Sequence, residues 1–406
     1  MKKVWDKWTR IALVKRILVG LILGAILGIA VPQATGIAIL GDVFVSALKA
    51  IAPLLVFFLV ISSLCNAGKS HGGVIKTVII LYMFSTVLAA VIAVFASMAF
   101  PVKMTLANAA TDTSAPQGIV EVLNNLLLNV VANPVSSLVN ANYVGILMWA
   151  VLLGLAFRAA DKMTKKVLAD VADGISMVVT WIINLAPFGI FGLVFNTVST
   201  NGLDIFTTYG KLLLLLVGCM LFIYFVTNPL LVYWCICQNP YPLIFQCLKR
   251  SALTAFFTRS SAANIPVNMK VCEEMGLDRD TYSVTIPLGA TINMDGAAIT
   301  ITVMTMATAF TLGIHVDIPT AIILSLLAAL SACGASGVAG GSLLLIPMAC
   351  SLFGISDDIS MQVVAVGFII GVVQDSVETA LNSSSDLLLS ASAEFRQWRL
   401  EGIKFK

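Results

Sequence analysis

The sequence predicts an all-α polytopic membrane protein, and three observations lead to that fold class. Of the 406 residues, 59% are hydrophobic and only 11% are charged, a balance far from that of soluble domains. Long apolar runs recur at lengths that span a hydrocarbon core of about 30 Å. Basic residues stand in short clusters between these runs, and the net charge of +3 is too small to indicate binding of nucleic acid.

The expected membrane spans follow the apolar runs in order. The first run is preceded by a basic N-terminus, which a signal peptide also has, although no small-residue cleavage site follows it. Within it Gly20, Gly24 and Gly28 repeat every four residues. That spacing favours close helix packing, but the general frequency of glycine in membrane helices explains it as well. The spans are expected at about residues 17–31, 43–65, 74–100, 119–157 (interrupted), 167–198 and 209–237.

Positive charge alternates between the connecting segments. Segments rich in Lys and Arg surround Lys69, Arg158 and Lys249 and include the C-terminus, whereas the opposite set offers little besides Lys103. By the positive-inside rule, both termini and the richer segments are cytoplasmic. The chain must therefore cross the membrane an even number of times.

Two stretches return to the side from which they enter. Residues 251–269 lie between two cytoplasmic lysines and are too short and polar for two crossings, and the small-residue run at 331–342 interrupts an apolar stretch whose ends are both external. Irregular backbone at membrane depth is tolerated where it is buried or lines a cavity. A hairpin followed by a long apolar span occurs twice in opposite orientation, which is the form of an inverted repeat in secondary transporters.

The spans that follow these hairpins carry acids without local bases. Between positions 280 and 395 there is no Lys or Arg, yet Asp295, Asp375, Glu378 and Asp386 lie in apolar surroundings. Such carboxylates are costly in a bilayer and face a cavity or a partner. Their counter-charge must come from protons, from residues elsewhere in the chain or from bound cations.

Spacing places the last three of these acids on one helical face together with Asn382. This polar stripe indicates a wall turned toward a cavity, although a polar seam between helices is the alternative. Asn293 and Asp295 are two residues apart and precede Gly296, so we expect local unwinding that frees carbonyl oxygens. Oxygen ligands suit a hard cation such as Na⁺. A proton relay through the same acids is the competing interpretation.

Four motifs resemble those of the dicarboxylate/amino acid:cation symporters, the family of glutamate transporters. They are TRSSAANIP (258–266), PLGATINMDG (287–296), SACGASGVAGGS (331–342) and QDSVETALNSSSD (374–386). The resemblance implies eight transmembrane helices, two re-entrant hairpins and a homotrimer in a bacterial inner membrane. It also implies sodium-coupled import by an elevator-like alternation of access, and no enzymatic activity.

The family pattern further implies a division into scaffold and transport parts. We expect scaffold helices in residues 1–72 and 104–206, and a transport helix in 73–103. The core of the transport part is expected in 207–406. It comprises hairpins at about 240–270 and 319–354 and helices at about 280–312 and 359–395.

The resemblance also implies the binding residues. For substrate they are Arg259, Ser260, Ser261, Ala297, Val338, Ser342, Asp375, Glu378, Thr379 and Asn382, with Asp375 taking the α-ammonium and Asn382 and the two serines the α-carboxylate. For sodium they form three sets: Gly289, Asn293, Asn382 and Asp386; Thr291, Met294, Ala332, Cys333 and Ala335; and Tyr82, Ser85, Thr86 and Asp295.

Departures from the acidic-substrate members indicate the specificity. Those members have an arginine at the position of Glu378 and a threonine at that of Ala297. An arginine binds a second carboxylate in a bidentate manner, whereas a glutamate repels it. We therefore expect small neutral substrates, L-serine and L-threonine, with Arg259 balancing Asp375 and Glu378. A proline common at the second hairpin tip of those members is Ala339 here.

Other functions remain open at the level of sequence. A cation channel with a carboxylate-lined pore is one, an intramembrane aspartyl protease another, and a transporter of a different neutral amino acid or of a dicarboxylate a third. The eight cysteines have no zinc or disulfide spacing, and we expect them to be reduced packing residues.

Overall fold

The computed structural model describes residues 11, 13–66, 73–106, 128, 131–203, 205–333 and 340–403, and these segments are helical without a strand. Six helical stretches among them are long and apolar enough to cross a membrane. In lipid the backbone has to satisfy its own hydrogen bonds, which helices do within one segment. The predicted class, a helical membrane protein, is confirmed. None of the eight cysteines is in a disulfide in the structure; seven are buried or half-buried, whereas Cys237 is exposed and is not a packing residue.

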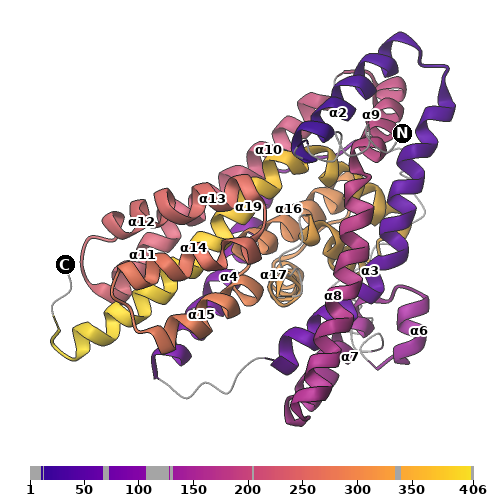
Figure 1. Cartoon of the computed structure of the whole chain (residues 1–406). Helices are drawn as coiled ribbons and strands as arrows, with labels where there is room; N and C mark the ends of the chain where they lie inside the picture. Colours follow the sequence, from indigo (N-terminus) through magenta and orange to yellow (C-terminus); the bar gives the residue numbers. More distant parts are fainter. Residues whose placement is uncertain are drawn as a thin grey trace.

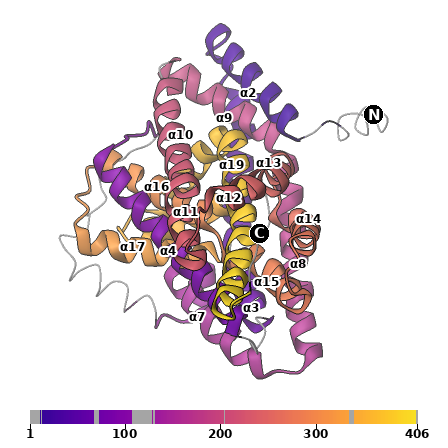
Figure 2. The ribbon, with the colours of Figure 1, turned by 90° about the vertical axis from the view of Figure 1, so that its left-hand side faces the viewer.

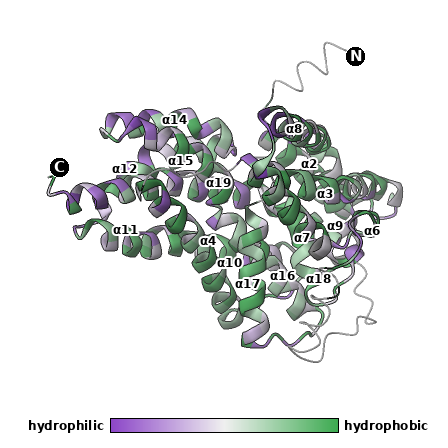
Figure 3. Ribbon diagram, turned by 90° about the horizontal axis from the view of Figure 1, so that it is seen from below, coloured by the Kyte–Doolittle hydropathy of each residue, from purple (hydrophilic) through white to green (hydrophobic). Residues whose placement is uncertain are grey.

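Hydropathy follows this arrangement. Figure 3 shows hydrophobic colour along most helices, whereas hydrophilic colour gathers around α14 and near the C-terminus.

Short polar residues begin several helices. The side chain of Asp317 caps α17 and that of Asp161 caps α8, each accepting a backbone N–H. Hydrogen bonds from the Thr320 hydroxyl and amide hold the pKa of Asp317 below its usual value.

One group of helices lies together on the right of Figure 1. Within it α2 packs along α9, and α3 packs against α7, α8 and α9. The group comprises α2 (Leu13–Ala30), η1 (Thr35–Ala38), α3 (Ile39–Asn66), α6 (Pro134–Val139), α7 (Tyr143–Ala156), η2 (Phe157–Ala159), α8 (Lys162–Asn184) and α9 (Ala186–Asn201).

The second group surrounds α19 (Asp357–Leu400), a 44-residue helix that runs through the middle of the molecule (Figures 1 and 2). At 1.5 Å per residue it is about 66 Å long. Its neighbours are α4 (Gly73–Ala99), α10 (Ile205–Phe222), α11 (Asn228–Ile236), α15 (Arg279–Ile292) and α16 (Asp295–Thr311), and the π-helical η3 (Ile223–Thr227) connects α10 with α11.

Two chain reversals complete this second group. The first consists of α12 (Tyr241–Cys247), the π-helical η4 (Leu248–Ala252) and α13 (Leu253–Thr258), and it turns at Arg259 into α14 (Ser261–Glu274). The second consists of α17 (Ile318–Ala332) and, after residues that lie outside the described part, η5 (Gly341–Leu345) and α18 (Ile346–Ser351). The first turn has Arg259 at φ 52°, and Gly340 before η5 has φ 73°.

The run expected as one span at 167–198 is divided in the structure. Helix α8 ends at Asn184 and α9 begins at Ala186, with Leu185 between them. Pro187 explains the break, because it has no N–H to donate and its ring disfavours helical backbone before it. Of the interrupted run at 119–157, α6 and α7 are described, and most of its first half lies outside the described residues.

The three glycines of α2 lie against the backbone of α9. A Cβ atom on Gly24 would be 2.6 Å from the carbonyl oxygen of Phe191, and one on Gly28 would be 3.0 Å from that of Phe195. A Cβ atom on Gly20 would come still closer to the backbone of α9, at the carbonyl oxygen of Pro187. The four-residue glycine spacing therefore reflects close helix packing, as one of the two interpretations predicted.

Replacing Gly24 by alanine should destabilise the protein because the new methyl group has to push α2 from α9. We expect the free energy of unfolding to fall by about 1–3 kcal/mol, the usual cost of overpacking. Thermal unfolding of the purified protein in detergent measures this. Gly36→Ala is the control, since a Cβ there has nothing within 4 Å. Equal losses in both variants would contradict the packing role.

Candidate functional site

The helix that carries Asn293 and Asp295 is interrupted between them. Helix α15 ends at Ile292, Asn293 and Met294 have non-helical backbone angles (φ −100°, ψ 79° and φ −119°, ψ 53°), and α16 begins at Asp295. A Cβ on Gly296 would lie 2.9 Å from Cα of Glu378, so glycine lets α16 approach α19 at this point. The unwinding predicted from the sequence is confirmed.

Asp295 is completely buried and is held by two hydroxyls of α4. Ser85 Oγ donates to Oδ2 at 2.7 Å, and Thr86 Oγ1 donates to Oδ1 at 3.1 Å. The amide of Met294 donates to Thr86 Oγ1 at 3.2 Å, which ties the interruption to the same helix. Asp295 is in none of the salt bridges found among the described residues. Its charge therefore has neutral protein partners only.

Asp386 lies on α19 in a second buried cluster. Asn293 Nδ2 donates to its Oδ1 at 2.9 Å, and the Tyr82 hydroxyl donates to its backbone oxygen at 2.9 Å. A Cβ on Gly289 would be 2.7 Å from the same Oδ1, so this glycine makes room for the carboxylate. Asn293 Oδ1 is buried and no donor among the described residues reaches it. This oxygen is free to coordinate a cation.

The C-terminal end of α17 also reaches the interruption. Cys333 Sγ donates to the carbonyl oxygen of Ile292 at 3.6 Å, and Ala332 beside it is buried. Thr291 donates its hydroxyl proton to the carbonyl oxygen of Leu288 within α15. Two residues of the predicted set, Ala335 and Val338, lie outside the described residues.

Asp375 joins both hairpins to α19. Arg259 Nε donates to its Oδ2 at 2.6 Å, and the amide of Gly340 donates to its Oδ1 at 3.1 Å. The two side chains are 11% and 4% exposed, so this ion pair is shielded from solvent. The residue expected to bind an ammonium group thus holds a guanidinium from the tip of the first hairpin.

Glu378 has a different set of partners from those expected. Its Oε2 accepts hydrogen bonds from Thr300 Oγ1 at 2.7 Å, from Ser342 Oγ at 2.9 Å and from Gln374 Nε2 at 2.5 Å. The salt bridge of Arg259 is to Asp375 alone in the described part of the chain. The expectation that Arg259 balances Glu378 as well is wrong: its guanidinium reaches Asp375 instead, and Oε2 of Glu378 accepts from neutral donors of three elements.

Asn382 is engaged with the interruption rather than with the first hairpin. Its Oδ1 accepts the amide of Gly296 at 2.7 Å, and its Nδ2 contacts Met294 Sδ at 3.4 Å. At the hairpin tip, Ser260 caps α14 by accepting the amide of Ala263, and Ser261 is buried. Thr379 and Ala297 are buried on α19 and α16, which pack together.

Several polar residues of the site were missed by sequence reasoning. Gln374 and Thr300 donate hydrogen bonds to Glu378, and Ser385 Oγ accepts a hydrogen bond from Asn293 Nδ2 at 2.8 Å. Gln374 precedes Glu378 by one helical turn and Ser385 adjoins Asp386, so the local sequence carried a signal for both. Thr300 lies on another helix, and nothing in the sequence connects it with Glu378.

A buried amide network fixes the first hairpin to α19. Asn264 Nδ2 donates to Ser383 Oγ at 2.9 Å, Asn268 Nδ2 donates to the Ser383 carbonyl oxygen at 2.8 Å, and Ser251 Oγ donates to Asn268 Oδ1 at 2.5 Å. Both arms of the hairpin take part, since Ser251 lies in η4 and the two asparagines lie in α14. The network positions the tip that carries Arg259.

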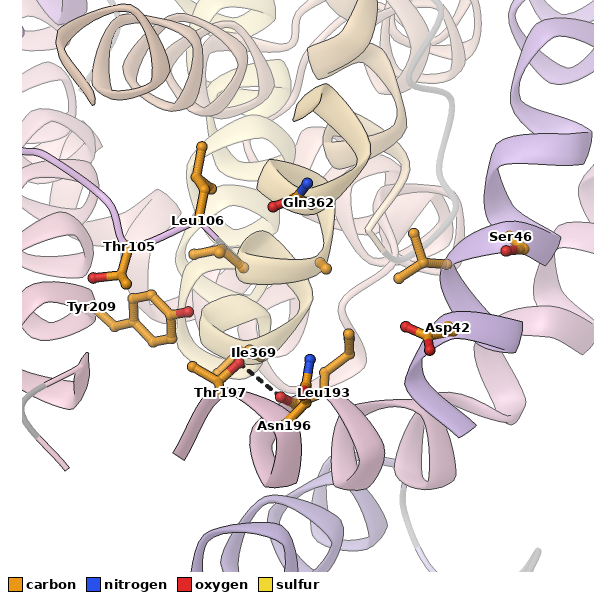
Figure 4. A pocket seen from close by; sticks show the side chains of 13 residues that line it. Asp42, Ser46, Thr105, Leu106, Leu193, Asn196, Thr197, Tyr209, Gln362 and Ile369 are labelled. Atoms are coloured by element: carbon orange, nitrogen blue, oxygen red, sulfur yellow. Dashed lines mark hydrogen bonds between the residues drawn. The ribbon is translucent and has the colours of Figure 1, made fainter. Parts of the chain in front are cut away.

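A cavity of about 250 Å³ lies away from these carboxylates, between the two groups of helices. In Figure 4, Asp42 and Ser46 of α3 face Tyr209 and Thr105 across it, and Gln362 of α19 closes one side. Its lining shares no residue with the predicted site. It lies at a junction between the two groups of helices and not at the buried polar centre.

Comparison with known proteins settles the family. A family model described as the sodium:dicarboxylate symporter family matches residues 13–394. The chain belongs to this family. It is 57% identical over 403 residues to the serine/threonine transporter SstT of Bifidobacterium adolescentis, covering 99% of this chain and 94% of that protein. It is 55% identical over 400 residues to SstT of Streptococcus thermophilus, covering 98% and 100%.

Membership assigns this symporter to transport rather than catalysis, so the protease interpretation is set aside. A protein identified by the same name in another Streptococcus thermophilus strain is 56% identical over 400 residues. The resemblance seen in the four sequence motifs is thus confirmed at the level of the family. The description of the family names sodium and dicarboxylates as the species that its symporters carry.

The buried Arg259–Asp375 pair should show strong energetic coupling. Arg259→Gln leaves an unpaired buried carboxylate, which costs about 3–5 kcal/mol of folding free energy. In the double variant Arg259→Gln, Asp375→Asn, the loss should be smaller than the sum of the single losses. Chemical unfolding of the purified protein measures the cycle.

The exposed pair Arg250–Glu274, whose side chains are 37% and 39% exposed, is the matched control. Replacing both members by glutamine should reveal a coupling of at most about 1 kcal/mol. Additive losses at Arg259 and Asp375 would show that the two side chains do not interact in the folded protein.

Proposed function

We propose that this protein imports L-serine and L-threonine together with sodium by an alternating-access, elevator-like mechanism. The observation that carries the proposal is Glu378, a buried carboxylate held among hydroxyl groups at the position where acidic-substrate relatives are expected to have arginine. A second carboxylate on the substrate would be repelled there, whereas a hydroxyl group could donate to Glu378. The printed names of the similar proteins support the same substrates.

In this proposal the substrate's α-ammonium replaces the Arg259 guanidinium on Asp375. Asn382 and the Ser260–Ser261 tip would bind the α-carboxylate after Asn382 releases its contact with Met294. Thr379, Ala297, Val338 and Ser342 would line the side-chain end. The 2.6 Å ion pair supports this order, because it satisfies Asp375 while no substrate is present.

The sodium sites would lie at the α15–α16 interruption. Asp295 with Tyr82, Ser85 and Thr86 forms one set, and Asp386 with Gly289, Asn293 and Asn382 forms a second. Backbone groups of Thr291, Met294, Ala332 and Ala335 with Cys333 form the third. Asp295 and Asp386 have neutral partners alone among the described residues, and Asn293 Oδ1 is free, which supports cations over a proton relay.

Coupling would follow if sodium favours the closed second hairpin. Cys333 of that hairpin contacts Ile292, the last residue before the interruption, and Ser342 contacts Glu378. Cation binding at the interruption would stabilise the conformer that makes both contacts and thereby shift the population toward it. Substrate and sodium would then be enclosed together.

The proposed architecture has eight transmembrane helices, two re-entrant hairpins and both termini in the cytoplasm, in a homotrimer of the bacterial inner membrane. Residues 1–72 and 104–206 would form the scaffold, and 73–103 with 207–406 the moving part. The two groups of helices seen in Figure 1 support this division, as does the polar cavity at their junction.

Uptake of labelled serine into proteoliposomes tests the function. We expect uptake to need an inward sodium gradient, to be competed by threonine and to be unaffected by glutamate. Preloaded serine should also exchange with external label, because exchange is a property of carriers and not of channels. Full uptake without sodium, strong competition by glutamate or absence of exchange would each refute the proposal.

Removing the charge of Glu378 should widen the specificity. In Glu378→Gln the repulsion of a second carboxylate disappears, so we expect aspartate or glutamate to compete with serine more strongly than in the wild type, by about ten-fold for a change of about 1.4 kcal/mol. Inhibition curves in the uptake assay measure the change. The control is Glu394→Gln. Glu394 lies on the same helix, but its Oε1 accepts a hydrogen bond from the backbone amide of Asp278, so its replacement should leave competition by aspartate or glutamate unchanged.

A further inference from the structure

An open groove lies between α4 and α10, far from the carboxylates. It has a volume of about 830 Å³ and is lined almost entirely by apolar side chains. Phe95 and Phe100 border it on the side of α4, and Leu214 and Phe222 border it on the side of α10; all four are exposed. Both helices lie in stretches able to span a membrane, and exposed apolar side chains such as these are what a surface in contact with lipid presents.

The floor of the groove is open at Gly218. A Cβ atom built there meets nothing within 4 Å, whereas the glycines of α2 meet the backbone of α9. Gly218 therefore does not serve close helix packing within this chain. It leaves a depression in the surface of α10 that a ligand can enter.

The length of the groove matches one leaflet. Along α10 it extends from Lys211 to Phe222, a rise of eleven residues, which is about 16 Å at 1.5 Å per residue. That is about half of a hydrocarbon core of about 30 Å. The groove thus accommodates an acyl chain that runs from the membrane surface to the midplane.

Charge distinguishes one end of the groove. Lys211 is the single charged side chain among the described residues that line it, and it lies in the second turn of α10. It is exposed and takes part in none of the salt bridges of the described chain. Basic side chains at this level attract anionic headgroups.

We propose that this groove binds one phospholipid with an anionic headgroup, its phosphate beside Lys211 and one acyl chain along Gly218 between α4 and α10. The proposal concerns a surface remote from Asp375 and Glu378 and is independent of which amino acid is transported. Because α4 also carries Ser85 and Thr86, the bound lipid would brace the helix that holds Asp295.

Lipid retention by the purified full-length protein tests the site. Native mass spectrometry in detergent micelles containing phosphatidylglycerol should show one more retained lipid than in micelles containing phosphatidylcholine. Gly218→Phe should remove this lipid because the ring fills the groove. Lys211→Gln should weaken retention of phosphatidylglycerol by about five-fold and abolish the preference for it over phosphatidylcholine.

Two variants serve as matched controls. Gly210→Phe lies on the same helix, also has open space around its Cβ and does not line the groove. Lys162→Gln removes an exposed lysine elsewhere. Both should retain lipid as the wild type does.

Equal retention by Gly218→Phe and Gly210→Phe would overturn the proposal, and so would an unchanged headgroup preference in Lys211→Gln. A shift of Gly218→Phe to a smaller oligomer would overturn it as well, because a second copy of the chain would then cover the groove. If Gly218→Phe does not fold, Lys211→Gln decides the matter alone, since its exposed side chain makes no contact needed for folding.

Discussion

Buried negative charge is the constraint on which the rest of the structure depends. Asp295, Glu378 and Asp386 lie in the interior with neutral hydrogen-bond partners, and Asp375 has the single guanidinium of Arg259. Burying an unpaired carboxylate costs several kcal/mol even after relaxation of the protein, roughly half of the stability of an ordinary domain. A fold that retains such groups has to protonate them or obtain their counter-charge from what it binds.

The surrounding elements are arranged around this requirement. The interruption at Asn293 and Met294 brings carbonyl and amide oxygens to the level of Asp386, and α4 supplies the hydroxyls for Asp295. The two reversals meet on opposite oxygens of Asp375, one through the Arg259 side chain and one through the Gly340 amide. Each reversal is therefore held by the same carboxylate that the substrate is proposed to occupy, which links ligand binding to hairpin position.

Outside this centre, the packing of the two helix groups follows a different principle. Helices α2 and α9 approach backbone to backbone because glycine removes the side chains between them, whereas α4 and α10 leave a groove that lipid is proposed to fill. Without a hydrophobic driving force between helices in a bilayer, such differences in close packing decide which surfaces associate. The α2–α9 contact lies in the first group of helices, and the α4–α10 groove lies in the second group, around α19.

The sequence by itself determined the membrane class, the interruption before Gly296 and the family, because hydropathy and short motifs are local signals. It also placed Asp375 and Glu378 on one helical face. Only the tertiary structure decided that Arg259 pairs with Asp375 and not with Glu378, and that Thr300, Ser342 and Gln374 hold Glu378. Those partners come from elements far apart in the chain, and which of two neighbouring carboxylates a guanidinium reaches depends on helix positions that no local pattern encodes.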